Sequence, residues 1–315
     1  MAHRSRATRS EFPRGSVKNN GGDDRSHVRR GTAHADDQPR RRPAGRRPAA
    51  PRPRRTADRA GVHGFTHHTG RRDTRRVLSL LARHADVVAV DLRGHGRSGG
   101  RSTVGDAEVL DLAAAVEWAR RQGYREVVTI GFSLSAAVAV CHAAGVRGTG
   151  DTAPDAVIAV SGPARWFSRE TAPMRRVHWL LEQPHGRLTA RLLGVRLDGP
   201  WGRVPLSPVE VVGTVAPIPL LLVHGDADPY FAPAHAHALH RATGGHAELW
   251  LEAGMGHGES GTGADLTDRL ARWAIGTVGG GPRTGAADPH TVPPAGAPGG
   301  ASTVVSSRSP GSEVA

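Results

Sequence analysis

The sequence predicts an α/β fold with one mostly parallel sheet and helices on both of its faces. Short apolar runs of strand length alternate with longer stretches of helical periodicity, and most of the runs end at a glycine or a polar residue. A parallel sheet that is covered on both faces needs this alternation and these nearly continuous apolar strands. The predicted strands are residues 86–91, 126–131, 156–161, 218–223 and a weaker one at 247–251.

Five helices fit between and after these strands. The first carries four apolar residues on one side, which is the spacing of an amphipathic helix: Val77, Leu78, Leu80 and Leu81. The third is small and apolar all round, as expected of a helix that packs against a central strand. The predicted helices are residues 72–83, 106–121, 134–144, 233–242 and 263–275.

The alternation breaks between residues 162 and 213. This stretch is rich in large apolar side chains, among them Trp166, Phe167, Trp179 and Trp201. We expect it to form a helical insertion over the carboxyl edge of the sheet.

Two terminal stretches differ in composition from the rest. Residues 1–60 hold 17 of the 42 Lys and Arg residues but only 6 of the 29 Asp and Glu residues. They lack apolar periodicity, which predicts a disordered Arg/Pro-rich extension. Residues 279–315 are rich in Gly, Pro, Ser and Thr and predict a second disordered tail. Residues 61–278 remain as one folded domain, large enough for a single core.

The basic extension raises the question of binding to nucleic acid or acidic lipid, which arginines favour by releasing counterions. The Arg-Pro runs at 40–55 contain no aromatic side chain to stack on bases, so we expect no nucleic-acid partner.

No targeting or membrane-spanning segment is predicted. The twin arginines Arg29 and Arg30 precede a polar stretch instead of an apolar one. The single cysteine, Cys141, excludes an internal disulfide and lies in an apolar run typical of the core. We therefore expect a cytoplasmic protein.

The strongest chemical motif is Gly131-Phe-Ser-Leu-Ser135, between a predicted strand and a helix of small residues. A sharp strand-to-helix turn exposes the hydroxyl of Ser133 and points the next backbone N–H at a developing oxyanion, and small neighbours let the turn close. Ser135 replaces the second glycine of the usual G-x-S-x-G pattern. A helix N-cap is the alternative role for Ser133.

Two further segments follow strands in the order serine, acid, histidine. His224-Gly-Asp-Ala-Asp-Pro229 offers two carboxylates, Asp226 and Asp228, either of which would orient an imidazole. A glycine-rich loop holds His257 after the last strand. The turn His63-Gly-Phe65 would supply the N–H of Phe65 as a second oxyanion donor beside the N–H of Leu134.

With these motifs, and with Asp91-Leu-Arg-Gly-His-Gly-Arg-Ser98 after a strand, the chain from Val62 to Ile275 resembles the α/β-hydrolase superfamily. The resemblance implies Ser133 as nucleophile, His257 as base and Asp228, in preference to Asp226, as the acid. It also implies that the insertion at about 162–213 is a short helical cap over the substrate pocket. The expected activity is hydrolysis of a carboxylic ester or related small acyl compound, without a metal or organic cofactor.

The amino end departs from this family. The strand before the His-Gly turn is central in the family's sheet, yet residues 56–62 contain two charges and one β-branched apolar residue. The earlier strands of the fold are not recognisable, so amino-terminal strands are expected to be missing or degraded. A catalytically impaired scaffold with the same fold is the alternative that this departure favours.

Two other readings compete with the hydrolase. Gly94-His-Gly-Arg-Ser-Gly99 matches the G-x-G-x-x-G of dinucleotide-binding oxidoreductases, but no helix opens on the loop and no acidic residue ends a strand about twenty residues later. His235, His237 and His240 suggest a metal site, but only the last two share a helical face and no third ligand is adjacent.

Overall fold

The computed structural model describes residues 28–29, 58–62 and 67–279. Their strands form one parallel sheet of seven strands in the order β1-β3-β2-β4-β5-β6-β7. The strands are β1 Val28–Arg29, β2 Asp58–Val62, β3 Asp86–Val90, β4 Val127–Phe132, β5 Ala156–Val160, β6 Leu220–Gly225 and β7 Glu248–Glu252.

The five predicted strands are confirmed as β3 to β7. The largest difference is at β6, which begins at Leu220 and not at Ile218. Pro217 and Pro219 lack an N–H and cannot donate to a neighbouring strand there. The carbonyl of Pro219 still accepts from the N–H of Val157 at 2.9 Å, which leads the chain into the sheet.

The composition reveals neither of the first two strands, of which the longer is Asp58–Val62. Its backbone runs between β3 and β4, with Asp58 opposite both Asp86 and Val127. Parallel pairing uses backbone N–H and C=O groups, so residues 58–62 can pair with both neighbours although their composition departs from the apolar runs of the other central strands. β1 and the first residues of β2 lie within the range 1–60 that the sequence assigns to a disordered extension. The rest of that range and the tail from residue 280 lie outside the described residues.

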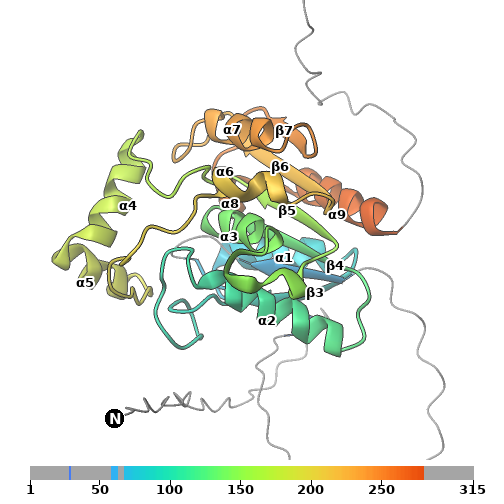
Figure 1. Cartoon of the computed structure of the whole chain (residues 1–315), viewed down its shortest axis with the longest axis horizontal. Helices are drawn as coiled ribbons and strands as arrows, with labels where there is room; N and C mark the ends of the chain where they lie inside the picture. The colour runs from blue at the N-terminus through green and yellow to red at the C-terminus, as the bar shows by residue number, and fades with distance from the viewer. Residues whose placement is uncertain (1–27, 30–57, 63–66, 280–315) are drawn as a thin grey trace, which may run out of the picture.

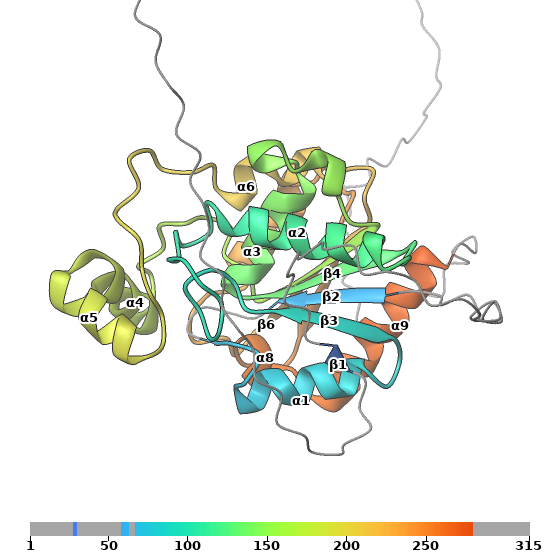
Figure 2. The same cartoon turned by 90° about the horizontal axis from the view of Figure 1, so that it is seen from below.

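Helices cover both faces of the sheet (Figures 1 and 2). Residues alternate along each strand, so that in β5 Val157 and Ala159 pack into one apolar cluster while Ile158 and Val160 pack into the other. Helices α2 Glu108–Arg121, α3 Leu134–Ala143 and α7 Ala234–Ala242 contribute to the first cluster, and α1 Arg72–Leu81 and α9 Ala264–Val278 to the second. The predicted helices are confirmed.

The insertion at 162–213, named the cap here, contains α4 Ala172–Glu182, α5 Pro184–Leu192 and α6 Pro208–Val211. Helices α4 and α5 stand away from the sheet, at the left of Figure 1. They pack closely because α5 has Gly186 at the contact, where a Cβ would overlap the backbone of Trp179.

Short elements complete the described chain. They are the 3₁₀ turns Val146–Gly148, Gly150–Thr152 and Val212–Thr214 and the single-turn helix α8 Gly258–Gly261. Among the described residues, none of the helices combines the length and the apolar character that crossing a bilayer requires.

Candidate active site

Ser133 lies on a sharp turn between β4 and α3. Its backbone has φ 54° and ψ −119°, a left-handed conformation that few non-glycine residues adopt. A Cβ at Gly131 would overlap the carbonyl of Ser135, so the turn closes only because this neighbour is glycine. The N–H of Ser133 donates to the carbonyl of Val160 on β5 at 2.8 Å, which fixes the turn at the carboxyl edge of the sheet.

His257 joins Ser133 to Asp228. Its Nε2 lies 2.8 Å from Oγ of Ser133, and its Nδ1 lies 2.7 Å from Oδ2 of Asp228. The three side chains come from positions 133, 228 and 257, beyond the carboxyl ends of β4, β6 and β7. The structure thus brings together the serine, acid and histidine singled out in the sequence, in the geometry of a nucleophile, base and orienting acid.

The carboxylate of Asp228 is fully covered, with a side-chain exposure of 0%. Burial alone would raise the pKa of this carboxyl, but the hydrogen bond and charge of His257 and two backbone N–H donors together hold the pKa below its usual value. These donors are Tyr230 at 2.8 Å and Phe231 at 3.1 Å, both on Oδ1. One oxygen is therefore held by the turn and the other faces the imidazole.

Asp226, the competing carboxylate, has a different partner. Its Oδ1 accepts from the N–H of Gly254 at 2.6 Å and so ties the acid loop to the histidine loop. Asp228, the residue that the family resemblance selects, is the one behind the imidazole.

Three residues that the sequence analysis did not assign support this arrangement. The rings of Tyr230 and Phe231 pack against His257, with centroids at 4.4 Å and 5.7 Å. Nε2 of the buried His224 lies 2.9 Å from the carbonyl of Phe231 and 3.8 Å from Oδ2 of Asp228. Burial lowers the pKa of His224, which favours a neutral ring that donates to this carbonyl. The sequence feature that could have pointed to His224 is its position directly before Gly225, at the start of the segment that holds Asp228.

Of the two expected oxyanion donors, the structure describes Leu134 but not Phe65. Leu134 is the first residue of α3, where backbone N–H groups have no partner within the helix, and it lines the cleft beside Ser133. Phe65 lies outside the described residues, so its role stays a prediction.

A cleft of about 390 Å³ opens in front of Ser133 and His257, a size that suits a small organic ligand. The cap forms one wall of it, and most of the lining is apolar. The cap residues with apolar side chains in this wall are Pro163, Trp166, Pro173, Met174, Val177, Leu180, Leu181 and Leu193.

A half-buried histidine and a buried glutamate that also line the cleft form an ion pair. Nδ1 of His67 is 3.2 Å from Oε2 of Glu259, whose side chain is 3% exposed. The hydrogen bond that His67 donates to the Glu259 carboxylate raises the pKa of His67 against the opposing effect of burial. The hydroxyl of Thr74 approaches the other oxygen of this carboxylate at 3.4 Å. The pair links α8, which follows His257, to the segment after the expected oxyanion turn.

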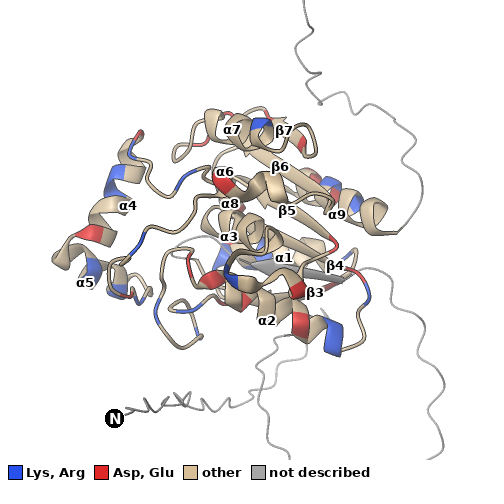
Figure 3. Cartoon of the chain, in the orientation of Figure 1, with Lys and Arg blue, Asp and Glu red and all other residues tan. Residues whose placement is uncertain are grey.

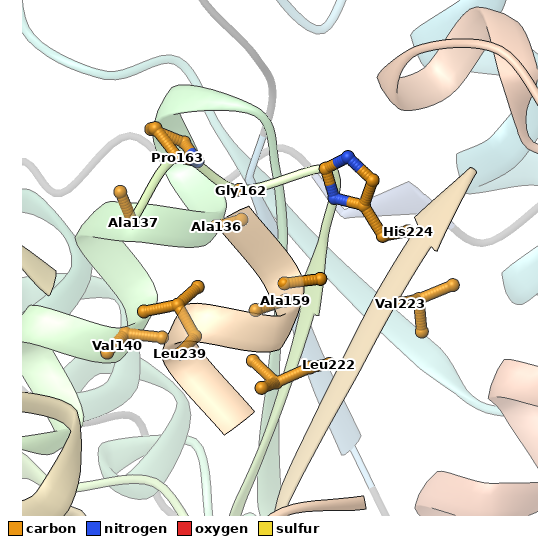
Figure 4. Close-up of a pocket in the computed structure, with 11 residues that line it drawn as sticks. Ala136, Ala137, Val140, Ala159, Gly162, Pro163, Leu222, Val223, His224 and Leu239 are labelled. Carbon is orange, nitrogen blue, oxygen red and sulfur yellow. The ribbon is translucent and has the colours of Figure 1, made fainter. Parts of the chain in front are cut away.

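A second, much smaller cavity lies behind the site, between α3, β5, β6 and α7. Its volume is about 10 Å³, and alanines 136, 137 and 159 together with Leu222 and Leu239 surround it (Figure 4). A space of this size holds at most one water molecule, so it is a packing defect and not a substrate site.

The glycine-rich loop at 94–99 packs against protein and not against an open groove. A Cβ at Gly94 would overlap the backbone of Ser102 and of Arg196 in the cap. Asp91 accepts from the N–H of Thr69 at 2.7 Å and of Arg97 at 3.0 Å. Helix α2 begins only at Glu108. The loop therefore joins the sheet to the cap, and it does not open a helix toward a phosphate.

The three histidines of α7 do not converge. Nδ1 of the buried His235 accepts from the N–H of Ala164 at 3.1 Å, at the base of the cap. In the part of the chain that the structure describes, no group of three or more His, Cys, Asp or Glu side chains is placed to hold a metal ion.

Comparisons with known proteins agree with this architecture. Residues 59–199 match the family described as serine aminopeptidase, S33. No curated protein sequence gives a match.

Solved structures with the same fold include esterases. The Pyrococcus furiosus esterase Pf2001 is 22% identical with a TM-score of 0.54, over 71% of this chain and 82% of that one. Est1E from Butyrivibrio proteoclasticus with bound ferulic acid is 18% identical with a TM-score of 0.50, over 73% and 92%. DcsB in complex with its substrate analogue is 15% identical with a TM-score of 0.51, over 72% and 92%. These likenesses show a shared fold.

Proposed function

We propose that this member of the α/β-hydrolase superfamily is a serine hydrolase that cleaves a carboxylic ester or related acyl compound. The observation that carries the proposal is the continuous pair of hydrogen bonds from Ser133 through His257 to Asp228, at 2.8 Å and 2.7 Å. The site faces a cleft of the right size for a small molecule. A cytoplasmic location and a small acyl substrate belong to the same proposal.

The first half of the reaction acylates the enzyme. Nε2 of His257 takes the proton of Ser133 as Oγ attacks the substrate carbonyl, and the buried carboxylate of Asp228 stabilises the resulting imidazolium. The N–H groups of Leu134 and Phe65 hold the oxyanion. The carbonyl re-forms, the bond to the alcohol breaks, and His257 returns the proton to the leaving alcohol.

The second half releases the acid. His257 removes a proton from water, which attacks the acyl-enzyme carbonyl, and the proton then passes to Oγ of Ser133 as the carboxylic acid leaves. The neighbours described as esterases support an ester as the bond that is cleaved. The apolar cap wall supports an apolar acyl or alcohol group.

The test is covalent labelling of the full chain by a fluorophosphonate probe. We expect the native protein to be labelled and Ser133→Ala to be inert, while Ser79→Ala, an exposed serine of α1, is labelled like the native protein. p-Nitrophenyl esters of increasing acyl length then identify the preferred group.

A preparation that is folded by circular dichroism but does not react with the probe would contradict the proposal. That result would favour the hypothesis of a catalytically impaired scaffold. The charged composition of the central strand β2 is the observation that supports this hypothesis.

A further inference from the structure

The cap exposes an unusual number of large apolar side chains. Nine such residues in the described part of the chain are exposed, and seven of them lie within 162–213. The seven are Phe167, Trp179, Leu188, Leu192, Leu193, Val204 and Leu206, with Leu192 at 80% and Leu188 at 62%. Single exposed apolar residues are ordinary, but a concentration on one small subdomain is typical of an interaction site.

Helices α4 and α5 each bury small or apolar residues and expose large apolar ones, which no part of the described chain covers. In α5 the buried residues are Gly186 and Ala190, whereas Leu188 and Leu192 are one turn apart and both exposed. In α4 the exposed Trp179 follows Arg175 and Arg176 by one turn. We use the name cap face for the exposed apolar residues of this region together with the arginines of α4 and α5. It consists of Trp179, Leu188, Leu192, Leu193, Arg175, Arg176, Arg187 and Arg191.

The charge of the cap differs in sign from that of the body. Residues 162–213 hold eight arginines against four carboxylates, whereas the rest of 67–279 holds fifteen arginines against seventeen carboxylates. Arginines lie on both α4 and α5 (Figure 3). Two caps that met face to face would repel each other, and an acidic surface would attract them.

The cap face continues into the candidate active site. Leu193 lines the cleft and is also 44% exposed, and it follows the most exposed leucine, Leu192. An amphiphilic molecule held at the cap face would thus meet the mouth of the cleft without crossing water.

We propose that the cap face docks on an anionic lipid surface. Leu188, Leu192 and Trp179 enter the boundary between headgroups and acyl chains, and the arginines of α4 and α5 lie at the acidic headgroups, as in other amphipathic helices that bind membrane surfaces. Docking does not require the chemistry of Ser133.

The test is co-sedimentation of the full chain with vesicles of phosphatidylglycerol and phosphatidylcholine. All proteins carry Ser133→Ala, so no lipid is cleaved and a failure to bind is distinct from a failure to hydrolyse. Residues 1–60 carry the same positive charge in every variant, so any attraction of acidic lipid to them is constant and the difference between variants is the measurement. We expect Leu188→Ser with Leu192→Ser to weaken binding by at least about tenfold.

The matched control is Leu110→Ser with Ile275→Ser, two exposed residues outside the cap at 37% and 38%, which should bind as the parent does. Arg176→Gln with Arg191→Gln should reduce the preference for phosphatidylglycerol over phosphatidylcholine. Raising the salt from about 0.1 M to about 1 M, which shortens the Debye length from about 10 Å to about 3 Å, should weaken the parent's binding.

Three results would overturn the proposal. One is no binding to phosphatidylglycerol vesicles by the parent protein. Another is equal binding by the parent and the double serine variant, with both folded by circular dichroism. The third is a dimer in light scattering that the double serine variant dissociates, because a second copy of the chain would then occupy the cap face.

Discussion

At the scale of single residues, the site depends on a serine held in a backbone conformation that serine disfavours. A non-glycine residue in such a region costs on the order of 1–3 kcal/mol and persists only where its surroundings fix it. Here the N–H of Ser133 donates to Val160 and its carbonyl accepts from Ala136 at 3.0 Å. The strained turn is therefore held from both sides, by β5 and by the start of α3.

The two carboxylates after β6 give a prediction with an internal control. Asp228→Asn removes the charge that stabilises the imidazolium of His257 and favours the wrong tautomer, so we expect kcat to fall by about 10⁴. Asp226→Asn keeps an oxygen that accepts from Gly254 and should retain most of the activity. The measurement is kcat of both variants with a p-nitrophenyl ester. Similar losses in both variants would mean that the acid loop matters only as a structural unit.

At the scale of elements, α4 is joined to the acid loop through one threonine. Oγ1 of Thr171 accepts from the N–H of Met174 at 3.3 Å, as an N-cap, and donates to the carbonyl of Tyr230 at 2.9 Å. Tyr230 packs on His257, so the cap wall and the ring of His257 are both held by the segment at Tyr230. In the sequence, the only indication of this helix N-cap is a threonine before a helical stretch.

Thr171→Ala should loosen α4 by about 1 kcal/mol, because an N-cap and a contact between elements are both lost. Hydrogen exchange of residues 172–182 should become faster, and KM should rise more than kcat falls, because α4 lines the cleft and does not touch the reacting atoms. Thr171→Ser keeps both hydrogen bonds and should behave as the native chain does. Unchanged exchange in the alanine variant would show that packing alone holds α4.

At the scale of the whole molecule, buried histidines link stability to pH. Burial lowers the pKa of His142 in α3 from 6.5 to about 4, and burial also lowers the pKa of His95, His224 and His235. The unfolded chain therefore binds more protons than the folded chain between pH 6.5 and pH 4. Their contribution to stability is complete above pH 6.5 and is lost as the pH falls. His67, whose pKa Glu259 raises, acts in the opposite sense.

We expect the free energy of unfolding, measured with urea, to decrease as the pH falls from 6.5 toward 4. His142 alone contributes about 3 kcal/mol to this decrease. His142→Gln cannot titrate, so its profile should be flatter over this window, and its loss of stability at neutral pH measures the packing cost separately. A variant profile parallel to the native one would contradict the assignment.

The sequence by itself determined the α/β alternation, because strands buried on both faces must be apolar runs and the helices between them must be amphipathic. It also placed Ser133, Asp228 and His257 at strand ends, since parallel strands share one carboxyl edge. It did not reveal β2, whose pairing is made by the backbone. It also did not reveal that the side chain of Glu108 holds the loop before α2. That fully buried carboxylate in α2 accepts from Ser102, Thr103 and Gly105.

The residues themselves left Asp226 and Asp228 open and only the family resemblance preferred Asp228, whereas the tertiary structure shows Asp228 behind the imidazole. Only the tertiary structure showed that Tyr230, Phe231 and His224 support this pair, and that some apolar residues of the cap line the cleft while others are exposed. Periodicity shows that a helix has an apolar side, but the partner of that side depends on how distant segments pack. A local sequence pattern holds no information about such contacts. The identity of the chemical groups was therefore readable from the chain, and their mutual distances were not.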